Sequence, residues 1–193
     1  MTNTEIILHK ATDFMMKAHC GQFRKDGITP YFVHPLRVSA LLSRHGANHN
    51  AILCGLWHDV LEDHPDTRGD LVSELMTYNI DCDERIIGYL EALCKPDLKE
   101  GNRAERNVMF CNKVIYGGDI PIFVKICDRI DNVLDSKGLG DLSEKYVVEE
   151  TGYLIEKFSK LGHGRIWASA LLTLIDARWE IMSRNGWIEC QMK

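Results

Sequence analysis

Residues 51–64 read AILCGLWHDVLEDH, and this stretch decides the fold. Its apolar side chains recur at three- and four-residue steps, which is the spacing of an amphipathic helix. Asn50 stands before the stretch as a candidate N-cap, and Pro65 follows it where a helix cannot continue. The spacing therefore predicts a helix with one face in the core.

The same stretch carries four ionisable side chains. His58 and Glu62 are four residues apart, as are Asp59 and Asp63, so on a helix the four share one patch. Their neighbours are apolar, which predicts burial, and buried charges must be paired or coordinated. A divalent cation would supply that compensation.

Helical periodicity continues through most of the chain. The predicted helices cover residues 5–20, 35–46, 51–64, 70–78, 83–94, 103–116, 120–136, 143–160 and 165–184. Thr4 is the predicted N-cap of the first helix, and Pro35 is the predicted first residue of the second. No alternating strand pattern, internal repeat or long linker is present, so we expect one all-α domain over residues 1–193, a bundle of roughly eight to ten helices.

Composition excludes several classes of protein. The 193 residues carry 28 acidic and 23 basic side chains, a net charge of −5, which argues against a nucleic-acid partner. No apolar run approaches the roughly 18 to 20 residues of a membrane span, and the start MTNTEIILHK lacks a secretion signal. Seven cysteines without a Cys-x-x-Cys pair suggest neither disulfides nor a thiolate zinc site. We expect a cytoplasmic protein with no membrane partner; the oligomeric state stays open.

A second predicted helix also gathers acidic side chains. In PIFVKICDRIDNVLDS, residues 121–136, an apolar stripe is accompanied by Asp128, Asp131, Asn132 and Asp135. Acids on one helix face repel each other unless a cation or solvent relieves the repulsion. We interpret Asp131 and Asp135 as acids of a solvated face.

The loop GQFRKDGITPYFV, residues 21–33, is rich in turn formers but carries Arg24, Lys25 and Tyr31, and His34 follows it. Functional sites often lie on loops held by rigid helices. With His34, the candidate ligand set becomes two imidazoles and two carboxylates. Such a set suits manganese, iron, zinc or magnesium and leaves positions for water and phosphate oxygens.

The chemistry that this pattern favours is metal-assisted hydrolysis of a phosphate compound. Glu62, one turn beyond His58, is placed to orient or deprotonate a water, and Asp63 could share the proton transfer. Arg24 and Lys25 would neutralise a polyanionic substrate. An amide such as that of Asn132 could donate to a phosphate or ribose oxygen.

Three segments in order resemble the signatures of a known family. AHCGQFRKDGITPYFVHPLRV (18–38), LWHDVLED (56–63) and VKICDRIDN (124–132) are similar to those of the HD-domain alarmone hydrolases. That family includes the hydrolase half of Rel/Spo proteins and the small alarmone hydrolases, among them the metazoan SpoT homologue. The resemblance covers residues 11–136, and residues 143–184 are predicted to add two further helices.

The resemblance implies a single HD domain that removes the 3′-pyrophosphate of ppGpp or pppGpp, the alarmones of the stringent response. It implies manganese, or another divalent ion, held by His34, His58, Asp59 and Asp128. It implies activation of the attacking water by Glu62 and Asp63. It implies substrate contacts from Arg24, Lys25, Tyr31 and Asn132.

Some positions depart from the family pattern, and two other functions stay open. Trp57 precedes the His-Asp pair, and Leu134 and Asp135 follow Asn132 where Rel/Spo proteins tend to have Arg and Thr. An acid at position 135 would disfavour a nearby phosphate. One alternative is an NADPH 2′-phosphatase or a (deoxy)nucleotide phosphohydrolase of the HD superfamily. The other is a non-catalytic HD module that binds a nucleotide or a protein, such as a toxin-neutralising subunit.

Overall fold

The computed structural model describes residues 2–78, 83–136, 143–162 and 165–187, and these residues form helices and no strand. The α-helices are α1 (Asn3–Ala18), α2 (Val33–Arg44), α3 (His49–Trp57), α4 (Val60–Asp63), α5 (Arg68–Tyr78), α6 (Asp83–Leu93), α7 (Arg103–Gly117), α8 (Asp119–Leu134), α9 (Thr151–Ser159) and α10 (Ala168–Arg184). Two short 3₁₀ helices, η1 (Pro65–Thr67) and η2 (Leu98–Glu100), and a π-helical segment, η4 (Lys145–Glu150), complete them. The all-α prediction is confirmed. No helix in these ranges has the length and apolar character that a membrane span requires.

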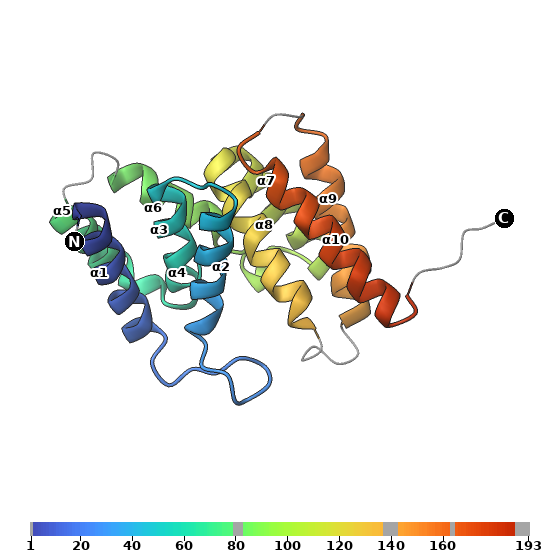
Figure 1. The fold of residues 1–193 in the computed structure, drawn as a ribbon, viewed down its shortest axis with the longest axis horizontal. Coiled ribbons are helices and arrows are strands. Elements are labelled where there is room, and N and C mark those ends of the chain that lie inside the picture. The colour runs from blue at the N-terminus through green and yellow to red at the C-terminus, as the bar shows by residue number, and fades with distance from the viewer. Residues whose placement is uncertain (1, 79–82, 137–142, 163–164, 188–193) are drawn as a thin grey trace.

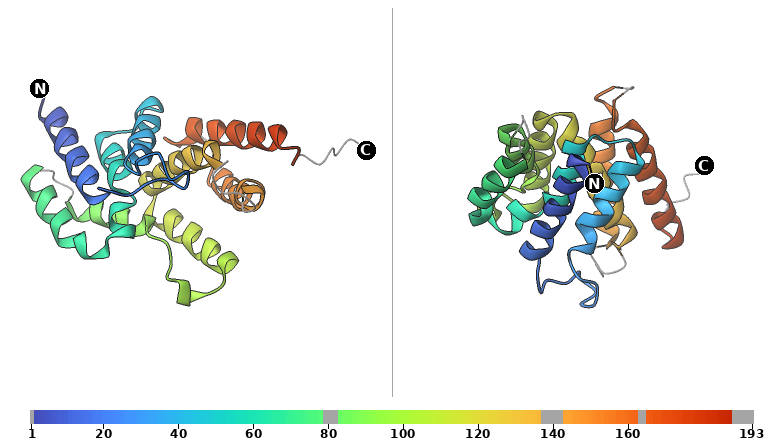
Figure 2. Two further views of the ribbon diagram at one scale, coloured as in Figure 1. Left: turned by 90° about the horizontal axis from the view of Figure 1, so that it is seen from below. Right: turned by 60° about the vertical axis from the view of Figure 1, so that its left-hand side comes forward.

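Helix α8 lies at the centre of the bundle. It packs against α2, α3, α6 and α7 and is covered on its outer side by α10, as Figures 1 and 2 show. Its residues from Pro121 to Asp131 are all buried. A helix covered on every side is normally apolar all round, yet α8 buries Lys125, Asp128, Arg129 and Asp131. Such charges need partners, so α8 is where a functional site is expected.

The buried core reaches from α1 to α10. Trp57, at the end of α3, is fully buried, and its indole N–H donates to the carbonyl of Ala11 in α1 at 2.9 Å. This hydrogen bond satisfies the only polar atom of the side chain, so the ring fills the core without an unpaired donor. The contact also fixes the end of α3, from which the next residue, His58, projects.

The starts of the first two helices differ from the prediction. Thr2, not Thr4, caps α1, because its hydroxyl accepts from the Glu5 backbone N–H at 3.3 Å while the Glu5 carboxylate accepts from the Thr2 N–H at 2.7 Å. This reciprocal capping box needs an acid three residues after the cap, which Thr4 lacks. Helix α2 begins at Val33, so Pro35 is its third residue; the missing N–H costs nothing in the first turn.

The predicted third helix is divided into two. Asn48 caps α3 from an extended backbone, and its side chain accepts from the Ala51 N–H at 3.0 Å, so the choice of Asn50 as the cap was wrong. The helical run then breaks at His58 and Asp59, and α4 follows. On a continuous helix, consecutive side chains diverge by about 100°. At the break, His58 and Asp59 face the same site although they are consecutive in the sequence.

Candidate metal centre

The four predicted ligand residues come together in the structure. His34 projects from the first turn of α2, His58 and Asp59 lie between α3 and α4, and Asp128 lies in α8. His34 Nε2 is 3.1 Å from Asp128 Oδ1 and 3.6 Å from Asp59 Oδ2. His58 Nε2 is 3.1 Å from Asp59 Oδ2 and 3.8 Å from Asp128 Oδ1. All four side chains are buried.

Hydrogen bonds at the far sides of the two imidazole rings orient the rings. His34 Nδ1 lies 2.7 Å from Asp131 Oδ2, and His58 Nδ1 lies 2.8 Å from the carbonyl oxygen of Gly55. Both partners only accept hydrogen bonds, so each Nδ1 carries a hydrogen. Each Nε2 atom therefore carries a lone pair, and these lone pairs point toward the carboxylates.

This arrangement fits a divalent cation. The buried His58 Nε2 has no hydrogen-bond partner. A nitrogen lone pair and carboxylate oxygens at these distances repel each other unless a proton or a cation lies between them. Two imidazole nitrogens backed by hydrogen-bond acceptors, together with two carboxylates, are the donors that a first-row divalent ion prefers. His34, His58 and Asp59 each offer a ligand atom, and these three atoms lie within 4.8 Å of one another.

The charges of the cluster shift its proton affinities. Burial opposes the charged form of His34, but hydrogen bonds and charges from Asp128 and Asp131 outweigh burial and raise the pKa of His34 to about 9. Burial opposes ionisation of Asp59 and Asp128 as well, but His58 beside Asp59 and Lys125 beside Asp128 hold both carboxyl pKa values well below their usual range. The carboxylates are therefore charged at neutral pH, and a metal ion competes with protons only at the histidines.

Donors fix both carboxylates in place. The Tyr31 hydroxyl donates to Asp59 Oδ2 at 2.7 Å, and the Lys125 ammonium donates to Asp128 Oδ2 at 2.6 Å. The side-chain amide of Asn132 donates to Asp128 Oδ1. Tyr31 and Asn132, predicted to contact substrate, thus also contact the acids of the cluster. Lys125 was not singled out from the sequence, although it precedes Asp128 by three residues on the same helix face.

The interpretation of Asp131 as a solvated acid was wrong. Asp131 is 5% exposed, and its carboxylate accepts from His34 and lies 3.7 Å from Arg37 Nη1. The residue follows Asp128 by three positions, so the two carboxylates lie on neighbouring parts of α8 and reach the same histidine. Asp131 is a positioning residue for His34. The signal that could have found it was this spacing within a helix that is buried all round.

The predicted catalytic pair lies beside the cluster. Glu62 lines the cavity described below, pairs with the Lys95 ammonium, and accepts from the Lys95 backbone N–H at 3.2 Å. Asp63 is exposed at the surface, yet partial loss of hydration together with the charges of Asp59 and Glu62 raises its pKa. A raised pKa suits a group that takes up and returns a proton near neutral pH. Lys95 was not predicted from the sequence as a partner of Glu62.

The loop with Arg24 and Lys25 is folded on itself. The Asp26 carboxylate accepts from the backbone N–H groups of Ile28 and Thr29 at 2.9 and 2.8 Å, which closes the turn. Arg24 turns back toward α8, where its Nη2 donates to Asn132 Oδ1 at 2.9 Å. Lys25 has no acid within 4.0 Å among the described residues. The rigid turn holds both cations at the edge of the site.

A cavity of about 660 Å³ opens over the cluster. That volume lies within the roughly 300 to 1,000 Å³ range of small-molecule sites. The proposed ligands His34, His58, Asp59 and Asp128 line it, together with Glu62 and the predicted substrate contacts Arg24, Lys25, Tyr31 and Asn132. Asp63 is not among its lining residues. The structure thus gathers nine of the ten predicted site residues around one cavity; their roles stay predictions.

The helical bundle contains a buried His-Asp pair joined by a histidine of α2 and an aspartate of α8, which is the arrangement that the resemblance to HD domains implies. A solved structure of a metazoan ortholog of SpoT, described as hydrolysing ppGpp and acting in starvation responses, matches the fold with a TM-score of 0.71. The match covers 94% of this chain and 97% of that chain at 19% sequence identity.

Sequence comparison gives the relatives. No known family profile matches the chain. It is 30% identical over 130 residues to a guanosine-3′,5′-bis(diphosphate) 3′-pyrophosphohydrolase of Borreliella burgdorferi and 29% identical over 158 residues to that of Aquifex aeolicus. These matches cover 65% and 81% of this chain but 18% and 21% of the relatives, so the chain spans about a fifth of their length. The chain is thus similar in sequence to part of proteins named as ppGpp 3′-pyrophosphohydrolases and similar in fold to the metazoan SpoT ortholog.

Proposed function

We propose that the protein is a metal-dependent nucleotide phosphohydrolase that removes the 3′-pyrophosphate of ppGpp or pppGpp. The observation that carries the proposal is the convergence of two histidines and two aspartates at a cavity that cations also line. Relatives named for this reaction support the substrate. The overall reaction adds water to ppGpp and yields GDP and pyrophosphate.

Manganese is the proposed native ion, held by His34, His58, Asp59 and Asp128. When bound, such an ion lowers the pKa of its water and screens the negative charge of the phosphate under attack. The protein's own part is to keep the ligands in position. Asp131 holds the His34 ring, and Tyr31 and Lys125 hold the two carboxylates.

Glu62 and Asp63 are proposed to handle the proton of the attacking water. Glu62 lines the cavity, and its pairing with Lys95 holds the carboxylate in position. Asp63, whose pKa is raised by partial loss of hydration and by neighbouring acids, is suited to hold a proton transiently. Lys95 leaves no net negative charge at Glu62, which favours the approach of an anionic substrate.

Arg24, Lys25 and Asn132 are proposed to bind the nucleotide. Arg24 can stack on a base and Lys25 can neutralise phosphate charge, whereas the Asn132 amide can donate to a phosphate or ribose oxygen. All three line the cavity. The nucleotide is the proposed small-molecule partner of the protein.

The test is a substrate panel. Purified protein is stripped of metal, reloaded with Mn²⁺ and incubated with ppGpp, pppGpp, NADPH and deoxynucleoside triphosphates, and products are followed by chromatography. Release of GDP and pyrophosphate from ppGpp is expected, at a kcat/KM above that for the other compounds. Preferred release of phosphate from NADPH would mean that NADPH, and not ppGpp, is the substrate. Binding of ppGpp without turnover would show a non-catalytic module.

A further inference from the structure

The cavity over the metal-ligand cluster is lined by more cations than the proposed chemistry uses. Four of them are paired with acids, namely Arg24 with Asp135, Lys95 with Glu62, Arg103 with Glu150, and Lys125 with Asp128. Within the described part of the chain, Lys25, Arg106 and Arg129 have no carboxylate within 4.0 Å. The whole protein is acidic, so this local excess of positive charge is specific to the cavity.

Arg129 is the most unusual of the three. Its side chain is only 7% exposed, and its Nε atom is buried without a hydrogen-bond partner. Nη1 lies 3.4 Å from the Thr151 hydroxyl, and the guanidinium carbon lies 4.2 Å from the centre of the Tyr146 ring. The ring and the hydroxyl compensate only part of the charge. A buried cation without a counter-ion is costly, which indicates that an anion belongs beside it.

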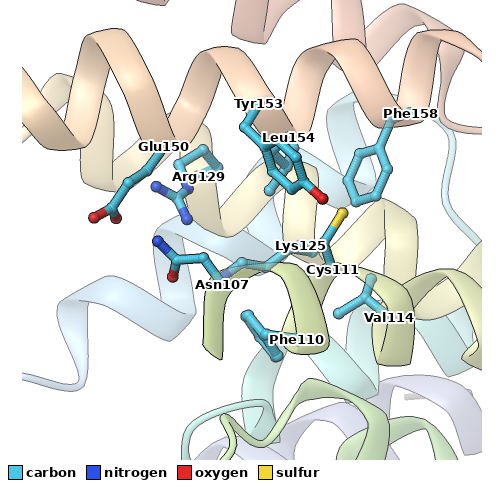
Figure 3. Close-up of a pocket in the computed structure, with 10 residues that line it drawn as sticks. All are labelled: Asn107, Phe110, Cys111, Val114, Lys125, Arg129, Glu150, Tyr153, Leu154 and Phe158. Carbon is cyan, nitrogen blue, oxygen red and sulfur yellow. The ribbon is translucent and has the colours of Figure 1, made fainter. Parts of the chain in front are cut away.

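The position of Arg129 on α8 places this cation apart from the metal ligands. It follows Asp128 directly, and consecutive residues of a helix point about 100° apart. Both line the same cavity, so Asp128 serves the cluster while Arg129 serves another wall. Figure 3 shows the Arg129 guanidinium and the side-chain amide of Asn107, from α7, extending into the space between the two helices.

The acid nearest to this space does not satisfy Arg129. Glu150, from η4, is seen near the Arg129 guanidinium in Figure 3. Its carboxylate is paired with Arg103, and its oxygens are more than 4.0 Å from the Arg129 nitrogens, since no ion pair joins the two side chains. Arg106 lines the cavity as well, where its Nη1 donates to the carbonyl of Gly101 at 2.7 Å. Arg106, Asn107 and Arg129 therefore all line this cavity, and Asn107 lies beside Arg129 (Figure 3).

We propose that Arg129, with Arg106 and Asn107, forms a second phosphate subsite, which binds the 5′-phosphate groups of a nucleotide whose 3′-pyrophosphate lies at the metal cluster. The inference rests on the proposed function and deepens it. An arginine fork and an amide are suited to phosphate oxygens. The subsite would select nucleotides that carry anionic groups at both ends, in preference to those phosphorylated at one.

The test measures binding, so it does not depend on turnover. Calorimetric titrations of the full, Mn²⁺-loaded chain with GDP and with guanosine give the gain in affinity that the 5′-diphosphate provides. Arg129→Gln is expected to reduce this gain by about 10- to 100-fold, the range for hydrogen bonds to a charged group, and to leave guanosine binding unchanged. Arg184→Gln removes the same charge from α10, where Arg184 pairs with Glu180 outside the cavity, and is expected to bind GDP like the wild type.

Two outcomes overturn the subsite. One is GDP affinity in Arg129→Gln within twofold of the wild type, and the other is an equal loss in Arg184→Gln. If Arg129→Gln does not unfold cooperatively, Arg129→Lys decides: it keeps the charge but not the planar fork, so a severalfold loss of the diphosphate gain is expected, and no loss overturns the proposal. The two proposals can fail separately. If the variants lose GDP affinity but the wild-type protein does not hydrolyse ppGpp, the subsite is supported and only the proposed function is refuted.

Discussion

Arg24 and Asp135 lie 111 residues apart in the sequence, and the Asp135 Oδ2 atom accepts hydrogen bonds from both Nε and Nη2 of Arg24, at 3.1 and 2.9 Å. The acid was interpreted as part of a solvated face. Its side chain is in fact 41% exposed and paired with a cation that lines the cavity. An acid that neutralises Arg24 weakens its attraction for phosphate, so we expect this pair to set how strongly the loop binds the proposed anionic nucleotide.

Asp135→Asn keeps the shape of the side chain and removes its charge. We expect the KM for ppGpp to fall by about 3- to 10-fold with little change in kcat, because Arg24 becomes available to the substrate and the partly exposed pair is screened by solvent. Steady-state kinetics measure the effect. Asp176→Asn, an equal change of charge on the exposed part of α10, is the control. A raised KM would show instead that Asp135 positions Arg24.

Asp131→Asn tests the hydrogen bond at the back of His34. Replacing a carboxylate that accepts from a ligand histidine reduces metal affinity by about 10- to 100-fold, and we expect a loss of that size. Competition with a metal-sensitive dye measures the affinity without reference to activity. Unchanged affinity would mean that the 2.7 Å contact between Asp131 and His34 does not orient the ring.

Substitutions of the proposed metal ligands and of the proposed catalytic pair are expected to have different effects on bound metal and turnover. His58→Ala and Asp59→Ala should lose both bound metal and turnover, whereas Glu62→Gln should retain metal and lose about 100-fold or more in kcat. Metal content by mass spectrometry, measured alongside ppGpp hydrolysis, separates the two. Turnover by metal-free Asp59→Ala protein would exclude the proposed chemistry.

The stability of the metal-free protein should depend on pH through His34. Burial opposes protonation, but Asp128 and Asp131 raise the pKa of His34 to about 9, above the value of about 6.5 in an unfolded chain. A raised folded-state pKa stabilises the protein fully below pH 6.5, and the stabilisation is lost as pH rises through about 9. Urea unfolding of chelated protein should show this decline.

With Mn²⁺ in excess, the same measurement should show a smaller decline or an increase with pH. The ion must displace the proton of His34, so its affinity, and with it the free energy of unfolding, grows as that proton is lost. Asp131→Asn, which lacks one of the charges that hold the proton, serves as the matched variant and should show a weaker pH dependence without metal. The free energy of unfolding is plotted against pH for chelated protein, Mn²⁺-loaded protein and Asp131→Asn. Parallel curves for these three samples would contradict the role given to His34.

The helices and the residues of the His-Asp cluster could be predicted because each leaves a local mark on the sequence. Apolar periodicity located the helices to within a few residues, and motif resemblance selected the histidines and acids that converge. The break at His58 and Asp59 could not be predicted, because both residues are compatible with a continuing helix and only tertiary packing interrupts it. Caps were missed where two candidates, such as Thr2 and Thr4, stood close together.

The missed site residues share one cause. Lys125, Arg129 and Asp131 are charged positions of a helix, which by default face solvent, and their burial follows only from the covering of α8 on every side. Lys95 reaches Glu62 across 33 residues of sequence, a contact with no local signal. The residues that pair with buried charges can therefore be identified only when the arrangement of the helices is known.

The four residues proposed to hold the ion are spread over positions 34 to 128 and come together where α2, α3 and α8 pack against one another. An unfolded or half-assembled chain has at most isolated donors, so the cation distinguishes the finished bundle from every earlier state. Free manganese in the surroundings would then act as a thermodynamic ligand of the native conformation, and scarcity of that element would shorten the lifetime of the protein as well as slow its chemistry.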